Sequence, residues 1–318
     1  MTSLKLGVIG AGHLGYHHAR LYHAMENVIL AGVADPNPAA RAKIEQDFVG
    51  VPVFCSVEEL LATGLDGVSI VAPTSEHFSL TKQALAAGVH VLVEKPMAAT
   101  VVEAEGMVDA AQNAGSILQV GHIERFNGAV MALFEAGMNP RFIECHRLSP
   151  FPGRGTDVSV VLDLMIHDLD IVLKLAGSEV TSVDAVGVPV FSTEEDIANV
   201  RIRFASGCVA NLTSSRISVE RMRKIRIFDP NAYVSTDYSA QEVLVYSKKA
   251  GAIQPDSNPM ENIVITPLPV RKEEPLKMEL EAFVSSIETG SAPQVSSEDG
   301  LRALQLAWRI IDAMRGQQ

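Results

Sequence analysis

The sequence predicts an α/β protein with two domains: a doubly wound parallel sheet in residues 1–122, and an α+β domain with a large, mainly antiparallel sheet in residues 123–318. Short buried strands alternate with helices as far as Gly121, which is typical of a parallel sheet covered by helices on both faces. After about Ile123, strands joined by short turns dominate, which favours an antiparallel sheet. A length of 318 residues fits two domains.

The chain begins with an apolar strand that leads directly into a glycine-rich turn. Gly10-x-Gly12-x-x-Gly15 follows this strand, and a helix is expected from His13 to about residue 25. The order of strand, glycine turn and helix is the context that a dinucleotide-binding fingerprint requires. Gly10 permits the tight turn, Gly12 lets the backbone approach a pyrophosphate, and the helix N-terminus offers free N–H groups. The residues expected to contact NAD here are Gly10, Gly12, His13, Leu14 and Gly15.

A second signal lies at the end of the next strand. The expected strand 28–34 is followed by Asp35, twenty residues beyond Gly15. A carboxylate at this strand tip accepts hydrogen bonds from both hydroxyls of an adenosine ribose and repels a 2′-phosphate. Pro36 follows it, where an arginine would bind that phosphate. NAD is therefore favoured over NADP, and a nucleotide-free unit with an incidental glycine turn is the alternative.

Each later strand of this Rossmann domain is predicted from a short apolar run bounded by turn residues. Ser56 is an expected helix N-cap with Glu59 in a capping box, and Gly88 and Gly115 end helices. The expected strands are 51–54, 67–72, 89–93 and 117–120, and the expected helices are 38–48, 57–62, 75–87 and 100–114. Ligands of such sheets bind beyond the carboxyl ends of the strands.

Polar residues stand just past two of these strand ends. Those expected to contact NAD are Pro73, Thr74, His77, Glu94 and Lys95. A lysine that directly follows a buried strand, with a proline after it, is held in a cleft rather than in solvent. On position alone, a surface lysine in a turn is an equally good interpretation of Lys95.

The second domain is predicted from four helices and a series of strands. Its expected helices are 126–136, 158–175, 279–288 and 298–314, and the last of these is expected to be able to pack back on the first domain. Its expected strands are 141–149, 180–190, 198–204, 208–215, 223–228, 232–238 and 242–247. Residues 248–272, which contain Gly251, Pro255, Pro259 and Pro267, are expected to be partly irregular.

The long helix 158–175 carries an acid and a histidine on one face. Asp163 and His167 are four residues apart, and Asp170 lies one turn further on. Polar groups on a helix this apolar need a cleft or partners. A capping carboxylate and a satisfied core histidine are the alternative, but the nucleotide-binding pattern and Lys95 favour chemistry.

These motifs resemble the Gfo/Idh/MocA oxidoreductases, which include sugar and cyclitol dehydrogenases. The resemblance rests on the glycine-rich loop, on Glu94-Lys95-Pro96 and on Asp163-x-x-x-His167, and it covers essentially the whole chain. It implies that Lys95, Asp163 and His167 are the catalytic residues of an NAD-dependent dehydrogenase acting on a CH–OH group.

A narrower resemblance is to the family branch that acts on nucleotide sugars, the UDP-N-acetylglucosamine 3-dehydrogenases. The segments that carry it are 121–127, 146–151, 163–170 and 214–218. It implies oxidation of the sugar 3-hydroxyl ahead of transamination, toward a diamino sugar for lipid A. Guanidinium groups match diphosphate oxygens, and the candidates are Arg125, Arg147, Arg154 and Arg216. We expect Arg125, Arg154 and His167 to contact the substrate, with a surface ion pair as the alternative for each arginine.

The implied reaction is reversible oxidation of a secondary sugar alcohol. His167 removes the hydroxyl proton, which suits an imidazole with a pKa near neutrality. Lys95 stabilises the developing alkoxide, and Asp163 orients His167 or holds a neighbouring hydroxyl. No metal is expected, because His13 and His17, although four residues apart, have no carboxylate or thiol companion nearby in the sequence.

Three alternatives remain open at this stage. Another activity of the same family, on a free sugar, inositol or a linear-tetrapyrrole-like molecule, keeps the fold and the cofactor. A non-catalytic NAD-sensing protein leaves the set Lys95, Asp163 and His167 unexplained. A structural interaction protein leaves the cofactor fingerprint without a purpose.

Composition limits the partners. The formal charge of −12, with no broad basic stripe, argues against nucleic acid or an anionic membrane surface. Cys55, Cys145 and Cys208 are scattered without metal-binding spacing, which fits a reducing compartment.

No apolar run is long enough to span a bilayer, and the first strand begins almost at the N-terminus, so we expect a cytoplasmic protein. A broad antiparallel sheet with an exposed face favours a homodimer or homotetramer.

Overall fold

The computed structural model describes residues 3–151, 157–249 and 262–316. The chain divides into two compact units. Unit 1 comprises Met1–Ile123 and Glu274–Leu304, and unit 2 comprises Glu124–Glu273 and Gln305–Gln318. The expected boundary near residue 122 therefore lies beside the boundary between the units, while residues 274–304 return to unit 1.

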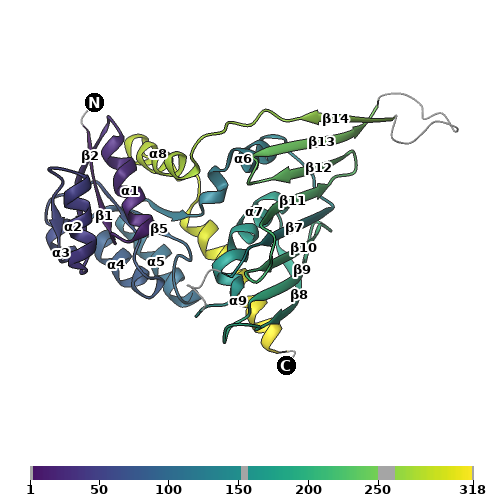
Figure 1. Cartoon of the computed structure of the whole chain (residues 1–318), viewed down its shortest axis with the longest axis horizontal. Helices are drawn as coiled ribbons and strands as arrows, with labels where there is room; N and C mark the ends of the chain where they lie inside the picture. Colours follow the sequence, from purple (N-terminus) through teal and green to yellow (C-terminus); the bar gives the residue numbers. More distant parts are fainter. Residues whose placement is uncertain (1–2, 152–156, 250–261, 317–318) are drawn as a thin grey trace. The chain divides into compact units, whose positions relative to one another are not determined.

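Unit 1 is built on a parallel sheet (Figure 1). Its six strands, in the order β3-β2-β1-β4-β5-β6, are β1 (Leu4–Ile9), β2 (Val28–Ala34), β3 (Val53–Phe54), β4 (Gly67–Ile70), β5 (His90–Glu94) and β6 (Leu118–Gly121). All the pairings are parallel. The chain winds outward from β1 to β3 and then from β4 to β6, so the predicted doubly wound Rossmann sheet is confirmed.

Most helices of unit 1 begin and end within one residue of the expected positions, but the helix expected at 279–288 begins four residues earlier, at Pro275. They are α1 (His13–Ala24), α2 (Pro38–Asp47), α3 (Val57–Leu61), α4 (Thr74–Ala86), α5 (Val101–Ala114) and α8 (Pro275–Thr289). The Ser56 hydroxyl accepts the Glu59 N–H, as a helix N-cap does, and Thr100 with Glu103 forms a reciprocal capping box. Gly115 ends α5 in the left-handed conformation.

Unit 2 is built on an eight-stranded sheet (Figure 1). In the order β14-β13-β12-β11-β7-β10-β9-β8, its strands are β7 (Phe142–Leu148), β8 (Val180–Val188), β9 (Ile197–Phe204), β10 (Val209–Ser215), β11 (Met222–Phe228), β12 (Ala232–Asp237), β13 (Glu242–Lys248) and β14 (Ile263–Pro267). Among the described strands of this sheet only β7 and β10 pair in parallel, so the large, mainly antiparallel sheet is confirmed. The strand β14 lies inside the stretch expected to be partly irregular.

One face of the unit 2 sheet is buried under helices. The inward side chains of the strands alternate with outward ones, as in β9, and pack against α6 (Gly128–Glu135), α7 (Ile166–Ala176) and the end of α9 (Ser297–Arg315). The buried cluster includes Ile143, Val200, Leu212, Leu169 and Ile310. Such a core fixes the helices relative to the sheet within the unit.

Two helices of unit 2 differ from those expected. The expected helix 158–175 consists of a π-helical turn, η2 (Val161–Met165), followed by α7. The expected helix 126–136 starts later than expected: the 3₁₀ turn η1 (Ile123–Phe126) precedes it, and α6 begins at Gly128 with the Asn127 side chain accepting the Ala129 N–H. A π-helical turn widens the helix by one residue and is frequent at functional sites. Among the described residues no helix is both long and apolar enough to cross a bilayer.

Candidate functional site

The glycine turn of unit 1 leaves room for a bound phosphate. Gly10 has φ +97°, and a Cβ there would lie 2.5 Å from the Val71 carbonyl oxygen. A Cβ at Gly15 would overlap the Gly10 carbonyl oxygen, so α1 and β1 can approach only through this glycine. A Cβ at Gly12 would meet nothing within 4 Å, and no side chain caps the N-terminus of α1. This open, uncapped turn fits the pyrophosphate of a dinucleotide.

Asp35 connects the glycine turn to the tip of β2. Its carboxylate accepts the Ala11 N–H at 2.6 Å and the Asn37 N–H at 2.7 Å. The Arg41 guanidinium donates to the carbonyl oxygens of Asp35 and Pro36. Asp35 is therefore held in a fixed place beside the turn, where a ribose acceptor is needed.

The residues past β4 and β5 are held at one edge of the unit 1 sheet. The ring nitrogens of buried His77 lie 2.9 Å from the carbonyl oxygens of Ala72 and Pro96, which connects the two strand ends. Pro73 precedes the first turn of α4, which begins at Thr74. Lys95 follows β5 directly, and the Lys95–Pro96 peptide bond is cis.

The residue before Lys95 is Glu94, a buried acid that we expect to contact NAD. Glu94 accepts the Lys95 backbone N–H at 3.2 Å, and its other oxygen lies 3.3 Å from Nε2 of fully buried His18. A Cβ at Gly121 would come within 3.0 Å of the Glu94 carboxylate, so a larger residue there would displace this group. Glu94 is therefore packed inside unit 1 and supports the position of the Lys95 backbone.

A second buried carboxyl in unit 1 is one that sequence reasoning missed. Glu279 of α8 is fully buried, and neither carboxyl oxygen has a hydrogen-bond partner among the described residues. Burial raises the pKa of Glu279 well above its usual value, and the charge of Glu94 raises it further. The sequence did carry a signal for this burial, because Glu279 lies on the apolar stripe of α8 that Leu276, Leu280 and Phe283 form.

In unit 2, Asp163 and His167 lie on either side of the change from π-helix to α-helix. Asp163 belongs to η2 and His167 to the first turn of α7, and both are partly exposed. Their neighbours in α7, Asp168 and Asp170, are buried. A reactive pair on this turn is accessible, while the acids beside it face the interior.

Both buried acids of α7 are paired with arginines. Nε and Nη2 of Arg125 donate to the Asp170 carboxylate at 2.6 and 2.7 Å. Arg147 donates to Asp168 at 2.8 and 3.0 Å and to Glu124 at 2.9 Å. Burial raises the pKa of Asp168, and Arg147 offsets part of that rise. These are two-point contacts in which both partners are nearly fully buried.

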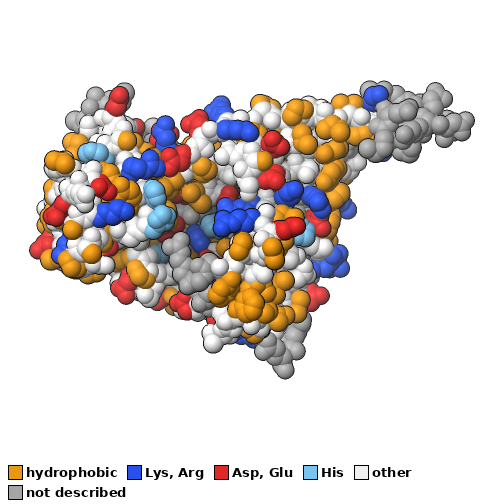
Figure 2. Space-filling model, viewed as in Figure 1, with side chains coloured by type: hydrophobic (Ala, Val, Ile, Leu, Met, Phe, Trp, Pro, Cys, Tyr) orange, Lys and Arg blue, Asp and Glu red, His pale blue; other side chains and the backbone are white. Residues whose placement is uncertain are grey.

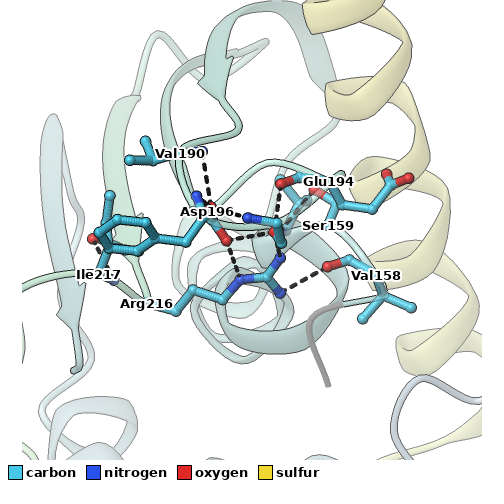
Figure 3. Close-up of polar contacts among 11 residues, drawn as sticks. Val158, Ser159, Val190, Glu194, Asp196, Arg216 and Ile217 are labelled. Atoms are coloured by element: carbon cyan, nitrogen blue, oxygen red, sulfur yellow. Dashed lines mark hydrogen bonds and ion pairs between the residues drawn. The ribbon is translucent and has the colours of Figure 1, made fainter. Parts of the chain in front are cut away.

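Arg216 anchors the segment that leads into the π-helical turn (Figure 3). It donates to Asp196 at 2.8 Å, to the Val158 carbonyl oxygen at 2.7 Å and to the Ser192 hydroxyl at 2.9 Å. Asp196 also accepts backbone N–H groups of residues 190–192, and although burial opposes it, these hydrogen bonds lower the pKa of Asp196. The contacts connect β10, the 190–196 loop and the start of the long helix.

The charges of these arginines are thus compensated within unit 2. Arg125, Arg147 and Arg216 each contact a buried carboxylate, a pairing that the sequence alone did not show. Arg154 lies outside the described residues. Within the described part of the chain, no group of three or more His, Cys, Asp and Glu side chains could hold a metal ion, and the His13 and His17 rings meet edge to face.

Two protein-family models match the chain, one within each unit. Residues 4–122 match the oxidoreductase family with an NAD-binding Rossmann fold, and residues 139–233 match the Gfo/Idh/MocA C-terminal domain. The chain belongs to the Gfo/Idh/MocA family. It is therefore an oxidoreductase with NAD as its cofactor, as the glycine turn and Asp35 indicated.

Several relatives that match along the full length are dehydrogenases. The UDP-N-acetylglucosamine 3-dehydrogenase of Acidithiobacillus ferrooxidans is 37% identical over 98% of this chain and 97% of its own. A crystal form of that enzyme superposes with a TM-score of 0.92, covering 99% of both chains. The myo-inositol 2-dehydrogenase of Thermotoga maritima is 26% identical over 96% of this chain and 94% of its own. The whole chain is thus similar to these enzymes, with no domain missing from the match.

Proposed function

We propose that this protein oxidises the 3-hydroxyl of the N-acetylglucosamine in UDP-N-acetylglucosamine, with NAD as hydride acceptor. The observation that carries the proposal is the full-length similarity to an enzyme with that activity, 37% identity against 25–26% for three full-length inositol dehydrogenases of the same family. The product, a 3-keto sugar nucleotide, is suited to transamination toward the diamino sugar of lipid A.

Three side chains are proposed to carry the chemistry. His167 takes the proton of the sugar hydroxyl, because a neutral imidazole is a base of the right strength near pH 7. The Lys95 ammonium stabilises the oxygen as negative charge develops on it. Asp163 orients His167 or holds a neighbouring hydroxyl. NAD, when bound, supplies the hydride acceptor; the residues proposed to hold it are Gly10, Gly12, His13, Leu14, Gly15, Asp35, Pro73, Thr74, His77, Glu94 and Lys95.

The diphosphate is proposed to bind near the chain segment that precedes Asp163. Arg154 is the candidate ligand there, because a guanidinium donates two hydrogen bonds to adjacent phosphate oxygens. Arg125 is a poorer candidate than Arg154 for contact with the substrate, because its side chain is buried and its Nε and Nη2 already donate hydrogen bonds to Asp170.

The test is NADH formation, followed by absorbance, with purified protein, NAD and a panel of alcohols. The panel holds UDP-N-acetylglucosamine, its uronate, free N-acetylglucosamine and myo-inositol, with an aminotransferase present to remove a keto product. Signal with UDP-N-acetylglucosamine alone supports the proposal. Turnover of myo-inositol instead would assign the chain to the inositol dehydrogenases, and NAD binding without any turnover would favour an NAD sensor.

Lys95→Met is the companion experiment. The variant should still bind NAD through the other residues proposed to hold it but lose turnover, because Met replaces the aliphatic part of the side chain and removes its charge. Lys82→Met is the matched control, since the Lys82 ammonium lies over the Phe78 ring on α4 and Lys82 is not among the residues proposed to hold NAD or the substrate. Near-normal activity of Lys95→Met would refute the assignment of Lys95.

We further propose that unit 2 mediates self-association into a dimer or tetramer. Four aromatic rings form a row across β7, β11, β12 and β13, with centroids 5.0–5.5 Å apart; they are Phe142, Phe228, Tyr233 and Tyr246. Phe228 is 38% exposed, and Val186, Val188 and Ile265 elsewhere on the sheet are more exposed still. Light scattering should give a molar mass that is a multiple of 34.1 kDa, and Tyr233→Lys should lower that mass toward the value for a single chain.

The expected surroundings are the cytoplasm, where NAD is available and free thiols persist. On the face shown in Figure 2, Lys and Arg side chains are interspersed with Asp and Glu. The net charge of −12 makes nucleic acid and anionic lipid unfavourable partners.

A further inference from the structure

His167 lies between two buried acids on the surface of α7. An α-helix turns by about 100° per residue, because it has 3.6 residues per turn. Asp168 is therefore about 100° from His167 on one side of the helix. Asp170 is three residues further on, a rotation of about 300°, which places it about 60° from His167 on the other side. The partly exposed histidine is flanked on both sides by carboxylates that face the interior of unit 2.

Each of these carboxylates is held at two points by a guanidinium from a different element. Arg147 comes from β7 and binds Asp168, while Arg125 comes from η1 and binds Asp170. Because each planar guanidinium meets both carboxylate oxygens, it restrains the direction of the carboxylate as well as its distance. Two such contacts on opposite sides of His167 resist rotation of α7 about its axis.

The guanidinium groups are themselves held in place. The Arg147 guanidinium lies 5.7 Å from the centre of the Tyr238 ring, and that of Arg125 lies 5.8 Å from the centre of the Phe134 ring. Glu124 takes a further hydrogen bond from Arg147 and lies 3.5 Å from Arg223. Three guanidinium groups thus face three carboxylates, so the cluster carries no net charge.

Stability alone does not account for this arrangement. A buried ion pair is weak evidence for stability, since well-packed apolar side chains often replace it without loss, and α7 already packs through Leu169, Ile171 and Val172. Two-point ionic contacts do supply a defined orientation. A group that must meet a substrate hydroxyl in a narrow range of positions needs that orientation.

We infer that the two buried pairs Arg147–Asp168 and Arg125–Asp170 are the device that positions His167 for proton abstraction. Arg125 and Arg147 are then positioning residues rather than ligands of the diphosphate. The inference deepens the proposed function, because it rests on His167 as the base.

The test uses substitutions that keep the charge and remove the planar two-point contact. Arg147→Lys and Arg125→Lys should each lower kcat by about 10- to 100-fold, because displacement of a reacting group by about 1 Å has effects of that size. The NAD dissociation constant should not change, since the residues proposed to hold NAD belong to unit 1. Arg315→Lys is the matched control, because Arg315 contacts Glu194 at 3.1 Å on the surface of unit 2.

A second readout follows the His167 ring itself. In protein with ¹⁵N-labelled histidine, the ring signals of His167 are identified as those missing in His167→Gln. They should shift in Arg147→Lys and Arg125→Lys and stay in place in Arg315→Lys. Circular dichroism verifies that each variant folds, and Asp170→Glu replaces a lysine variant that does not.

The inference requires both a lower kcat and displaced His167 signals. If kcat matches that of Arg315→Lys, or if the His167 signals keep their wild-type positions, the inference is wrong. Failure of the proposed function looks different, because the wild-type protein itself would then form no NADH with UDP-N-acetylglucosamine. In that event the ring signals alone decide whether the arginines position His167.

Discussion

Replacement of Glu279 by Gln should make unit 1 more stable, and by an amount that grows with pH. Glu279 is fully buried in α8, and both its carboxyl oxygens lack a hydrogen-bond partner among the described residues. Burial, and next the charge of Glu94, raise the pKa of Glu279 well above its usual value. The group therefore holds a proton in the folded chain at pH values where the unfolded chain has released it. Gln is neutral at every pH and has nearly the same shape.

The sign follows from proton linkage. For an acid whose pKa is raised by folding, the stability contribution is fully present below the unfolded pKa, about 4.3, and is lost as the pH rises toward the folded pKa. Within that window the free energy of unfolding falls by roughly 1 kcal/mol per pH unit. The advantage of Glu279→Gln over wild type should thus be small at pH 5 and reach up to about 2–3 kcal/mol two pH units higher.

The assay is urea unfolding of both proteins, followed by circular dichroism at a series of pH values. Glu281→Gln is the control, because Glu281 lies on the same helix, is exposed and pairs with Lys277. Its difference from wild type should stay near zero throughout. A Glu279→Gln difference that does not vary with pH would refute the reasoning, since it would mean that Glu279 ionises as easily in the folded protein as in the unfolded one.

Three further predictions concern single sites. Gly12→Val should weaken NAD binding by at least about tenfold in calorimetry while leaving the fold intact, because its side chain fills the open space over the turn; unchanged binding would remove Gly12 from the cofactor site. Arg216→Met should lower the free energy of unfolding of unit 2 by about 3 kcal/mol in urea, because it leaves a buried carboxylate without its cation; a loss near zero would mean that backbone N–H groups suffice. A thiol reagent should modify exposed Cys55 quickly and Cys145 and Cys208 only on unfolding, because burial raises the pKa of both buried thiols; mass spectrometry identifies the labelled site, and early labelling of Cys145 would contradict this.

The sequence by itself determined the features whose signals are local. A glycine turn between an apolar strand and a helix, an acid at the next strand tip and the cap at Ser56 are read within a few residues, because backbone geometry and capping act over that range. Alternation of strands and helices indicated a parallel sheet, since parallel strands need crossover helices. The motifs at Lys95 and at Asp163 and His167 led to the family, and the comparisons confirmed it.

Only the tertiary structure decided which charges meet. Arg125 and Asp170 are 45 residues apart, and Arg147 and Asp168 are 21 apart, so no local pattern shows that each arginine has a buried partner. The strand β14 and the return of residues 274–304 to unit 1 likewise depend on distant segments. The burial that raises the pKa of Glu279 exists only once α8 packs against the unit 1 core. Side-chain chemistry is written in the sequence, but solvation and the choice of partner are set by residues that folding brings together.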